Sequence, residues 1–262
     1  MNAASPSPLL EVRDVVVRHD RAAAPTVRGA SFSLERGECV ALVGASGCGK
    51  STLCRTIVGL GAAESGSILW HGRDVTALTR AARREFRAAV QMVFQDTSGA
   101  LDPRMSIENT LEEPLLVHFR KRYPTASSRR RRVAELLEKV ELSPDLATRH
   151  PHELSGGQRQ RIGIARALAT EPEVLIADEP LSALDVAVQA RLLRTLEKLL
   201  RESGLAMLFV SHDLAVVRCL CSRILVMDGG RFVEEGETDS VLVSPRHPFT
   251  RRLLAACPSF HS

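Results

Sequence analysis

Aromatic side chains are scarce in this chain of 262 residues: they make up 4% of it, with one Trp and one Tyr. Proteins that hold single-stranded nucleic acid stack its bases on aromatic rings, so this scarcity argues against that class. The formal net charge of +4 is also too small to indicate a nucleic-acid binder by itself. We therefore expect no nucleic acid among the partners of this protein.

Long hydrophobic runs are absent as well. No apolar stretch approaches the ~18 residues that a membrane-spanning helix needs. Residues 1–6 have neither the basic nor the apolar segment of a secretory signal. We expect them to form a short frayed tail.

The cysteines form no C-x-x-C pair, so the sequence has no motif of that kind for zinc or redox chemistry. The six are Cys39, Cys48, Cys54, Cys219, Cys221 and Cys257. We expect such scattered cysteines to act as small buried hydrophobic residues. With 44% hydrophobic and 25% charged residues, the chain has the composition of an ordinary globular protein.

One short segment fits the phosphate-binding pattern G-x-x-x-x-G-K-[ST]. It consists of Gly44, Ala45, Ser46, Gly47, Cys48, Gly49, Lys50 and Ser51. An apolar run at residues 39–43 precedes it and indicates a buried strand. The residues from Thr52 onward read as the start of a helix. Strand, loop and helix in this order are the context that the pattern requires.

The chemistry of this loop predicts a nucleotide site that extends from Gly44 to Thr52. Its glycines let the backbone curl so that N–H groups point at phosphate oxygens. The helix N-terminus adds partial positive charge. Lys50 supplies a cation for the β- and γ-phosphates, and Ser51 offers a hydroxyl to Mg²⁺. ATP and Mg²⁺ are therefore the expected cofactors.

A second apolar strand, at residues 174–177, ends in two acidic residues. In phosphate-loop hydrolases such a strand lies beside the loop, and its terminal aspartate holds Mg²⁺. Asp178 takes that metal role here. Glu179 follows it and is placed to act as general base on a water in line with the γ-phosphate.

The remaining motifs resemble those of ATP-binding cassette (ABC) ATPases. The segment from Leu154 contains the family's signature motif, and its predicted nucleotide-binding residues are Ser155, Gly156, Gly157 and Gln158. Gln95 resembles the glutamine of the Q-loop, residues 182–185 resemble the D-loop, and His212 resembles the switch histidine. Each motif occurs once, in the order of the family, over nearly the whole chain.

This resemblance implies a mechanism in which two cassettes face each other and enclose ATP between them. Ser155, Gly156 and Gly157 would contact the γ-phosphate that the partner's loop holds. His212 would bind the γ-phosphate, and Gln95 would reach Mg²⁺ or the attacking water. His19 stands where the family usually places an aromatic residue against adenine.

The expected fold class is α/β: a phosphate-loop (RecA-like) parallel sheet core, an N-terminal antiparallel β-subdomain and an inserted helical subdomain. We predict one ABC ATPase domain over residues 8–257. Its nucleotide-binding core would comprise 8–96 and 155–235, its helical subdomain 97–154, and a C-terminal tail 236–262. Within the helical subdomain, the four-arginine run 129–132 is interpreted as the solvated start of a helix.

Strands alternate with helices in the second half of the chain, which favours a mostly parallel sheet covered by helices. The pattern predicts helices at 155–169 and 186–201 and buried strands at 206–210 and 224–227. The segment 228–231 is typical of a hairpin turn.

Two further segments resemble the peptide and nickel import subgroup: the tail 247–256 and Asp102-Pro103-Arg104-Met105. Peptide importers usually have proline where Thr97 stands and often carry a longer, cysteine-rich tail. Both departures, together with Trp70 and residues 78–87, favour the nickel-import ATPase, with di- or oligopeptide import as the alternative. A non-transport ABC ATPase of DNA repair or translation is a third possibility, disfavoured because no coiled coil or second cassette is evident.

The resemblance also implies partners and location. We expect a second, separate ABC ATPase subunit, two transmembrane permease subunits and, indirectly, a solute-binding protein. The protein would lie peripherally on the cytoplasmic face of the cell (inner) membrane. Nickel itself would not touch this chain, because its eight histidines are scattered and form no ligand cluster.

Overall fold

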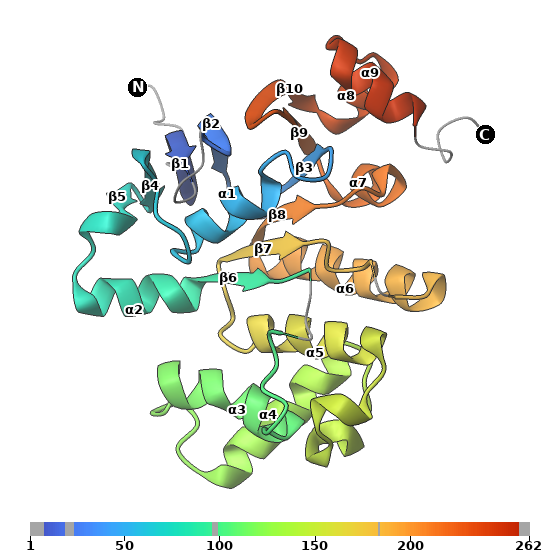
Figure 1. The fold of residues 1–262 in the computed structure, drawn as a ribbon. Coiled ribbons are helices and arrows are strands. Elements are labelled where there is room, and N and C mark those ends of the chain that lie inside the picture. The colour runs from blue at the N-terminus through green and yellow to red at the C-terminus, as the bar shows by residue number, and fades with distance from the viewer. Residues whose placement is uncertain (1–7, 19–23, 96–98, 183, 257–262) are drawn as a thin grey trace, which may run out of the picture.

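A computed structural model of the protein describes residues 8–18, 24–95, 99–182 and 184–256. Figure 1 shows three layers: a small sheet near the N-terminus, a larger central sheet, and a group of helices below it. In the described part of the chain, no helix has both the length and the apolar character to cross a bilayer.

The central sheet has six strands in the order β10-β9-β3-β8-β7-β6. These are β3 (Cys39–Gly44), β6 (Val90–Val93), β7 (Val174–Asp178), β8 (Ala206–Val210), β9 (Arg223–Asp228) and β10 (Arg231–Glu237). All neighbours are parallel except β9 and β10, which form an antiparallel hairpin at one edge. The strands and the hairpin turn predicted from the second half of the chain are confirmed. Strand β6 was not predicted, and it forms the opposite edge.

Two hydrophobic clusters cover the two faces of this sheet. Along β3, Val40 and Leu42 belong to one cluster, whereas Cys39, Ala41 and Val43 belong to the other. Because successive side chains of a strand point to opposite faces, a fully apolar strand needs cover on both sides. That requirement explains why the strands read as continuous apolar runs.

The smaller sheet covers one face and is antiparallel, in the order β2-β1-β4-β5. It consists of β1 (Leu10–Val17), β2 (Val27–Leu34), β4 (Ser65–Trp70) and β5 (Arg73–Asp74). Helices α1 (Lys50–Ile57) and α2 (Arg80–Ala89) accompany it, with the short turn η1 (Val75–Ala77) between β5 and α2. Leu10 and Leu34 from this sheet join Leu42 and Leu208 of the central sheet in one cluster.

Helices cover the other face. The predicted helical subdomain contains α3 (Ile107–His118) and α4 (Ala126–Lys139), with the short turns η2 (Pro144–Thr148) and η3 (Pro151–Glu153). Helix α5 (Gly156–Leu168) packs against both helices. The remaining helices are α6 (Val186–Ser203), α7 (Leu214–Leu220), α8 (Thr238–Val243) and α9 (Pro248–Ala255). Leu111, Leu136 and Ile162 are fully buried and join Phe209 of β8 in the second cluster. This is the fold class predicted from the sequence, while the exact domain boundaries stay a prediction.

The four-arginine run lies on α4 as expected, but its last member is not solvated. Arg132 is 8% exposed and forms ion pairs with Glu135 and Glu171, each at 3.0 Å. Arg129 and Arg130 pair with Glu112 and Glu108 of α3. The interpretation as a solvated helix start is therefore wrong for Arg132, because long arginine side chains reach carboxylates across the helical subdomain.

Candidate functional site

The phosphate loop connects β3 to α1 and depends on glycine at two close backbone contacts. A Cβ atom on Gly44 would lie 2.1 Å from the carbonyl oxygen of Met227, and one on Gly49 would lie 2.7 Å from that of Thr26. Gly49 also has φ 113°, a conformation that side-chain-bearing residues rarely adopt. The loop can therefore pass tightly between β9 and the start of β2 only with glycine at these positions.

Lys50 begins α1 and folds back over the loop. Its Nζ donates to the carbonyl oxygens of Gly44 at 2.8 Å and Ala45 at 2.9 Å. This places a cation beside the N-terminus of α1, where backbone N–H groups lack helical partners. Cys48 fills the space beneath, and burial raises the pKa of its thiol. The loop itself therefore contributes positive charge, which suits a phosphate group.

Asp178 ends β7 and points its carboxyl group at the loop. It is 3% exposed, and this burial raises its pKa above the ordinary value. A hydrogen bond with the Ser51 side chain opposes that shift, whereas the neighbouring charge of Glu179 adds to it. A buried carboxylate beside a hydroxyl is an oxygen donor set that suits a hard divalent cation.

Glu179 follows Asp178 with a left-handed backbone, at φ 48°. Its amide donates to the carbonyl oxygen of Val210, so the turn is held against β8. Gln95 Nε2 donates to Glu179 Oε2 at 3.0 Å, and His212 Nδ1 lies 3.5 Å from Oε1. A non-glycine residue in this conformation costs about 1–3 kcal/mol, which the surrounding contacts must offset. The turn places the carboxylate between two side chains from other segments.

A cavity of about 320 Å³ unites these residues. It is lined by Thr26, Gly44, Ser46, Gly47, Gly49, Lys50, Ser51, Thr52, Gln95, Asp178, Glu179 and His212. All except Thr26 were predicted from the sequence. Thr26 precedes β2 and belongs to no motif, so only the packing of the small sheet on the loop identifies it. His19, predicted to lie against adenine, is outside the described residues.

The signature residues lie elsewhere. Ser155 begins α5 as a capping box: its Oγ accepts from the N–H of Gln158, and Gln158 Oε1 accepts from the N–H of Ser155. Ser155 and Gly156 are exposed, and among the described residues that line the cavity none comes from this segment. The chain's own loop and its own signature motif therefore form two separate surfaces.

A family model described as "ABC transporter" matches residues 27–182, which include the phosphate loop, the signature segment and the acidic strand. The chain belongs to the ABC transporter family. The cassette is therefore an ATPase of that family, and its combination of two sheets and a helical subdomain is the cassette fold.

Solved and curated proteins agree with this assignment. The dimeric structure of the ATP-binding cassette MJ0796 in a post-hydrolysis state, bound to ADP and Pi, superposes on the cassette with a TM-score of 0.81. The identity is 29%, and the alignment covers 87% of this chain and 98% of that one. The oligopeptide transport ATP-binding proteins OppF of Salmonella typhimurium and Escherichia coli are each 47% identical over 234 residues. These alignments cover 88% of this chain and 69% of each relative.

The predicted nickel cargo finds no support in these relatives, which are named for oligopeptide transport. That prediction used Thr97 and the tail beyond residue 256, which lie outside the described residues, together with Trp70 and residues 78–87. The alternative reading, peptide import, is the better supported of the two.

Proposed function

We propose that this cassette hydrolyses ATP to drive peptide import through a membrane permease. The observation that carries the proposal is the 47% identity to two oligopeptide transport ATP-binding proteins across 88% of the chain. The site supports the ATPase half of the proposal, because the loop, the buried Asp178 and the acidic Glu179 share one cavity.

Within that cavity, the residues divide into phosphate, metal and proton-transfer roles. Lys50 and the loop N–H groups, from Gly44 to Thr52, would hold the phosphates. Mg²⁺, held by Ser51, Asp178 and Gln95, would neutralise charge on the phosphate oxygens. Glu179 would accept the proton of the attacking water, and His212 and Gln95 would hold its carboxylate in place.

The separation of loop and signature supports assembly with a second cassette. Ser155 and Gly156 are exposed and Gly157 is half-buried at a helix N-terminus that is suited to an anion, and none of the three lines the cavity at this chain's own loop. A second ABC ATPase with its own loop would supply that anion as the γ-phosphate of its ATP. We expect this partner to be a distinct subunit.

A groove beside the helical subdomain supports attachment to the permease. A cavity of about 380 Å³ lies between the end of α1, β6, α3 and α5, with Leu60 and Val117 in its lining. These two side chains are 63% and 47% exposed, so together they give the groove an apolar surface that a partner can cover. Phe94 lines this groove while its neighbour Gln95 lines the nucleotide cavity. A permease segment on the cytoplasmic membrane face would bind in this groove. Phe94 and Gln95 would then couple its position to the presence of nucleotide.

Reconstitution in proteoliposomes tests the proposal. The cassette would be assembled with the permease pair, a second cassette and the solute-binding protein encoded beside it. We expect oligopeptide to stimulate ATP hydrolysis and to accumulate inside, whereas nickel does neither. Stimulation by nickel alone would transfer the assignment to nickel import, and full activity without permeases would contradict a transport role.

The buried carboxylate of Asp178 makes a separate prediction about stability. Because its pKa is raised in the folded state, stability falls as the pH rises from the ordinary carboxyl pKa, and the cost of the buried charge is complete above the raised pKa. Asp178→Asn removes this cost, so the variant should unfold at a higher temperature than wild type at pH 7 without Mg²⁺. The difference should shrink as the pH falls toward the ordinary carboxyl range.

The unfolding temperature of the same variant with ATP and Mg²⁺ is the second measurement. ATP with Mg²⁺ should stabilise wild type strongly, by ~2.7 kcal/mol at one hundred times the Kd. In Asp178→Asn we expect most of that gain to be lost. If Asp178→Asn is less stable than wild type without Mg²⁺ but is stabilised as strongly by ATP with Mg²⁺, the role of Asp178 is structural.

A further inference from the structure

Two buried cysteines from distant parts of the chain lie in contact. Cys39 begins β3 and Cys221 follows α7, yet their Sγ atoms are 3.3 Å apart. They are 3% and 5% exposed. Ser222 donates its N–H to the carbonyl oxygen of Cys39 at 3.0 Å, which holds the two backbones side by side. The thiols therefore share one pocket of the core, although 182 positions separate them.

We propose that Cys39 and Cys221 are a modification site: they form an internal disulfide when the protein meets a small-molecule disulfide such as oxidised glutathione. One protein thiolate attacks the small disulfide, forms a mixed disulfide and releases the first small thiol. The other protein sulfur then attacks the bound protein sulfur and releases the second. Two protein thiols are oxidised by two electrons, their two protons leave, and one small disulfide is reduced to two thiols.

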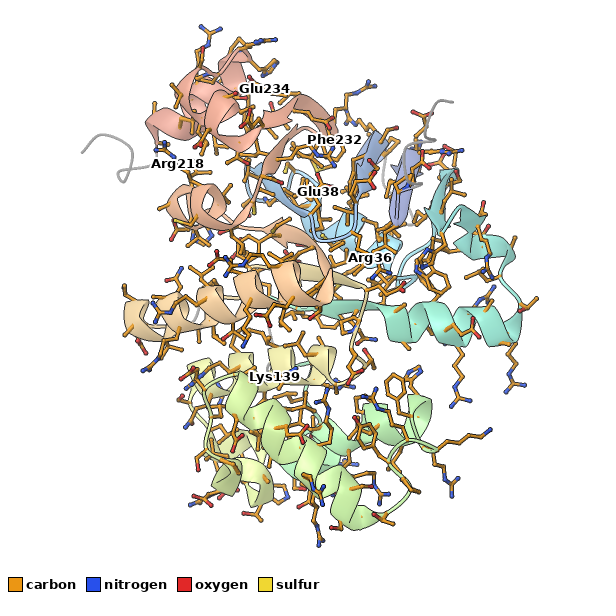
Figure 2. All side chains as sticks on the ribbon, turned by 180° about the vertical axis from the view of Figure 1, so that it is seen from behind. Arg36, Glu38, Lys139, Arg218, Phe232 and Glu234 are labelled. Carbon is orange, nitrogen blue, oxygen red and sulfur yellow. The ribbon has the colours of Figure 1, made fainter. Side chains whose placement is uncertain are left out.

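The end of α7 supplies the entry to this buried pair. The helix has only seven residues, and its Cys219 is exposed, so its last turn lies at the surface. Figure 2 labels Arg218, which precedes Cys219 on α7, and Glu38, which precedes Cys39. Leu214, Val216 and Val217 hold α7 in the core, so the local opening that uncovers Cys221 would start at the exposed last turn, at Arg218 and Cys219. Cys39 lies within β3, which is paired on both sides by β8 and β9, whereas Cys221 follows the end of α7, so Cys221 makes the first attack.

The cross-link would join two elements that carry the nucleotide site at their other ends. Strand β3 runs from Cys39 into the phosphate loop, and α7 begins directly after the His212 turn. Neither cysteine lines the nucleotide cavity. We therefore expect the disulfide to stabilise the core without removing any group that binds ATP.

Differential alkylation and mass spectrometry test this site in the full chain. After incubation with oxidised glutathione, the peptides that contain Cys39 and Cys221 should be linked, with a loss of two hydrogens. Cys219→Ser should form the same link, whereas Cys39→Ala and Cys221→Ala should not. The unfolding midpoint should rise by ~4–16 °C on oxidation and return with dithiothreitol.

Several outcomes would overturn the proposal. Glutathione attached to Cys219 alone, with Cys39 and Cys221 still alkylated after denaturation, would show that the pair does not react. A link in Cys39→Ala would assign it to other cysteines. If the alanine variants fold poorly, the wild-type link, located by peptide fragmentation, still decides the matter.

Discussion

Glu179→Gln is expected to lower the rate of ATP hydrolysis by about 10²–10⁴-fold, the usual cost of losing a general base. The amide keeps the shape of the side chain and its reach to Gln95 and His212, which lie 3.0 and 3.5 Å from the carboxylate oxygens. It cannot accept the proton of the attacking water. ATP binding should survive, since Lys50 and the loop are untouched.

The variant should therefore accumulate the ATP-bound pair of cassettes. Phosphate release in the assembled transporter would measure the rate, and nucleotide retention would measure the trapped state. Glu202→Gln on the exposed end of α6 is the matched control, and it should hydrolyse ATP as wild type does. If Glu179→Gln turns over near the wild-type rate, the base is another group and Gln95 or His212 is the next candidate.

Lys50→Ala is expected to weaken ATP binding by about 10–100-fold. A hydrogen bond to a charged group contributes roughly 1.5–3 kcal/mol, and each 1.4 kcal/mol is tenfold in affinity. Lys50 Nζ lies within hydrogen-bond distance of the Gly44 and Ala45 carbonyl oxygens, so the ammonium is already at the mouth of the loop. Removing it leaves the phosphates with the loop N–H groups and the proposed Mg²⁺ site.

Equilibrium binding of a fluorescent ATP analogue would measure this loss. Lys198→Ala removes the same charge from an exposed position on α6 and should leave the affinity unchanged. The two site variants should have opposite effects on nucleotide occupancy. Lys50→Ala should retain less ATP than wild type, whereas Glu179→Gln should retain more. Unchanged affinity in Lys50→Ala would mean that the loop backbone alone holds the phosphates.

Site residues that lie next to one another in the sequence could be predicted from the sequence alone. The phosphate loop places its glycines, Lys50 and Ser51 within one short segment, and the geometry of such a segment depends mainly on its own backbone. Asp178 and Glu179 follow a strand whose apolar run marks it as buried. Strands β7, β8 and β9 were also predicted, because a strand with both faces buried shows up in the sequence as a continuous apolar run.

Only the tertiary structure decided which distant residues meet. Thr26 lines the nucleotide cavity because the small sheet packs on the loop, and Arg132 is buried because Glu171 reaches it from beyond α5. Cys219 is exposed and Cys221 buried, although two positions separate them and one expectation covered both. Local patterns determine strands, loops and caps, because these depend on neighbouring backbone. Contacts between segments depend on how the layers pack, which no short stretch of sequence encodes.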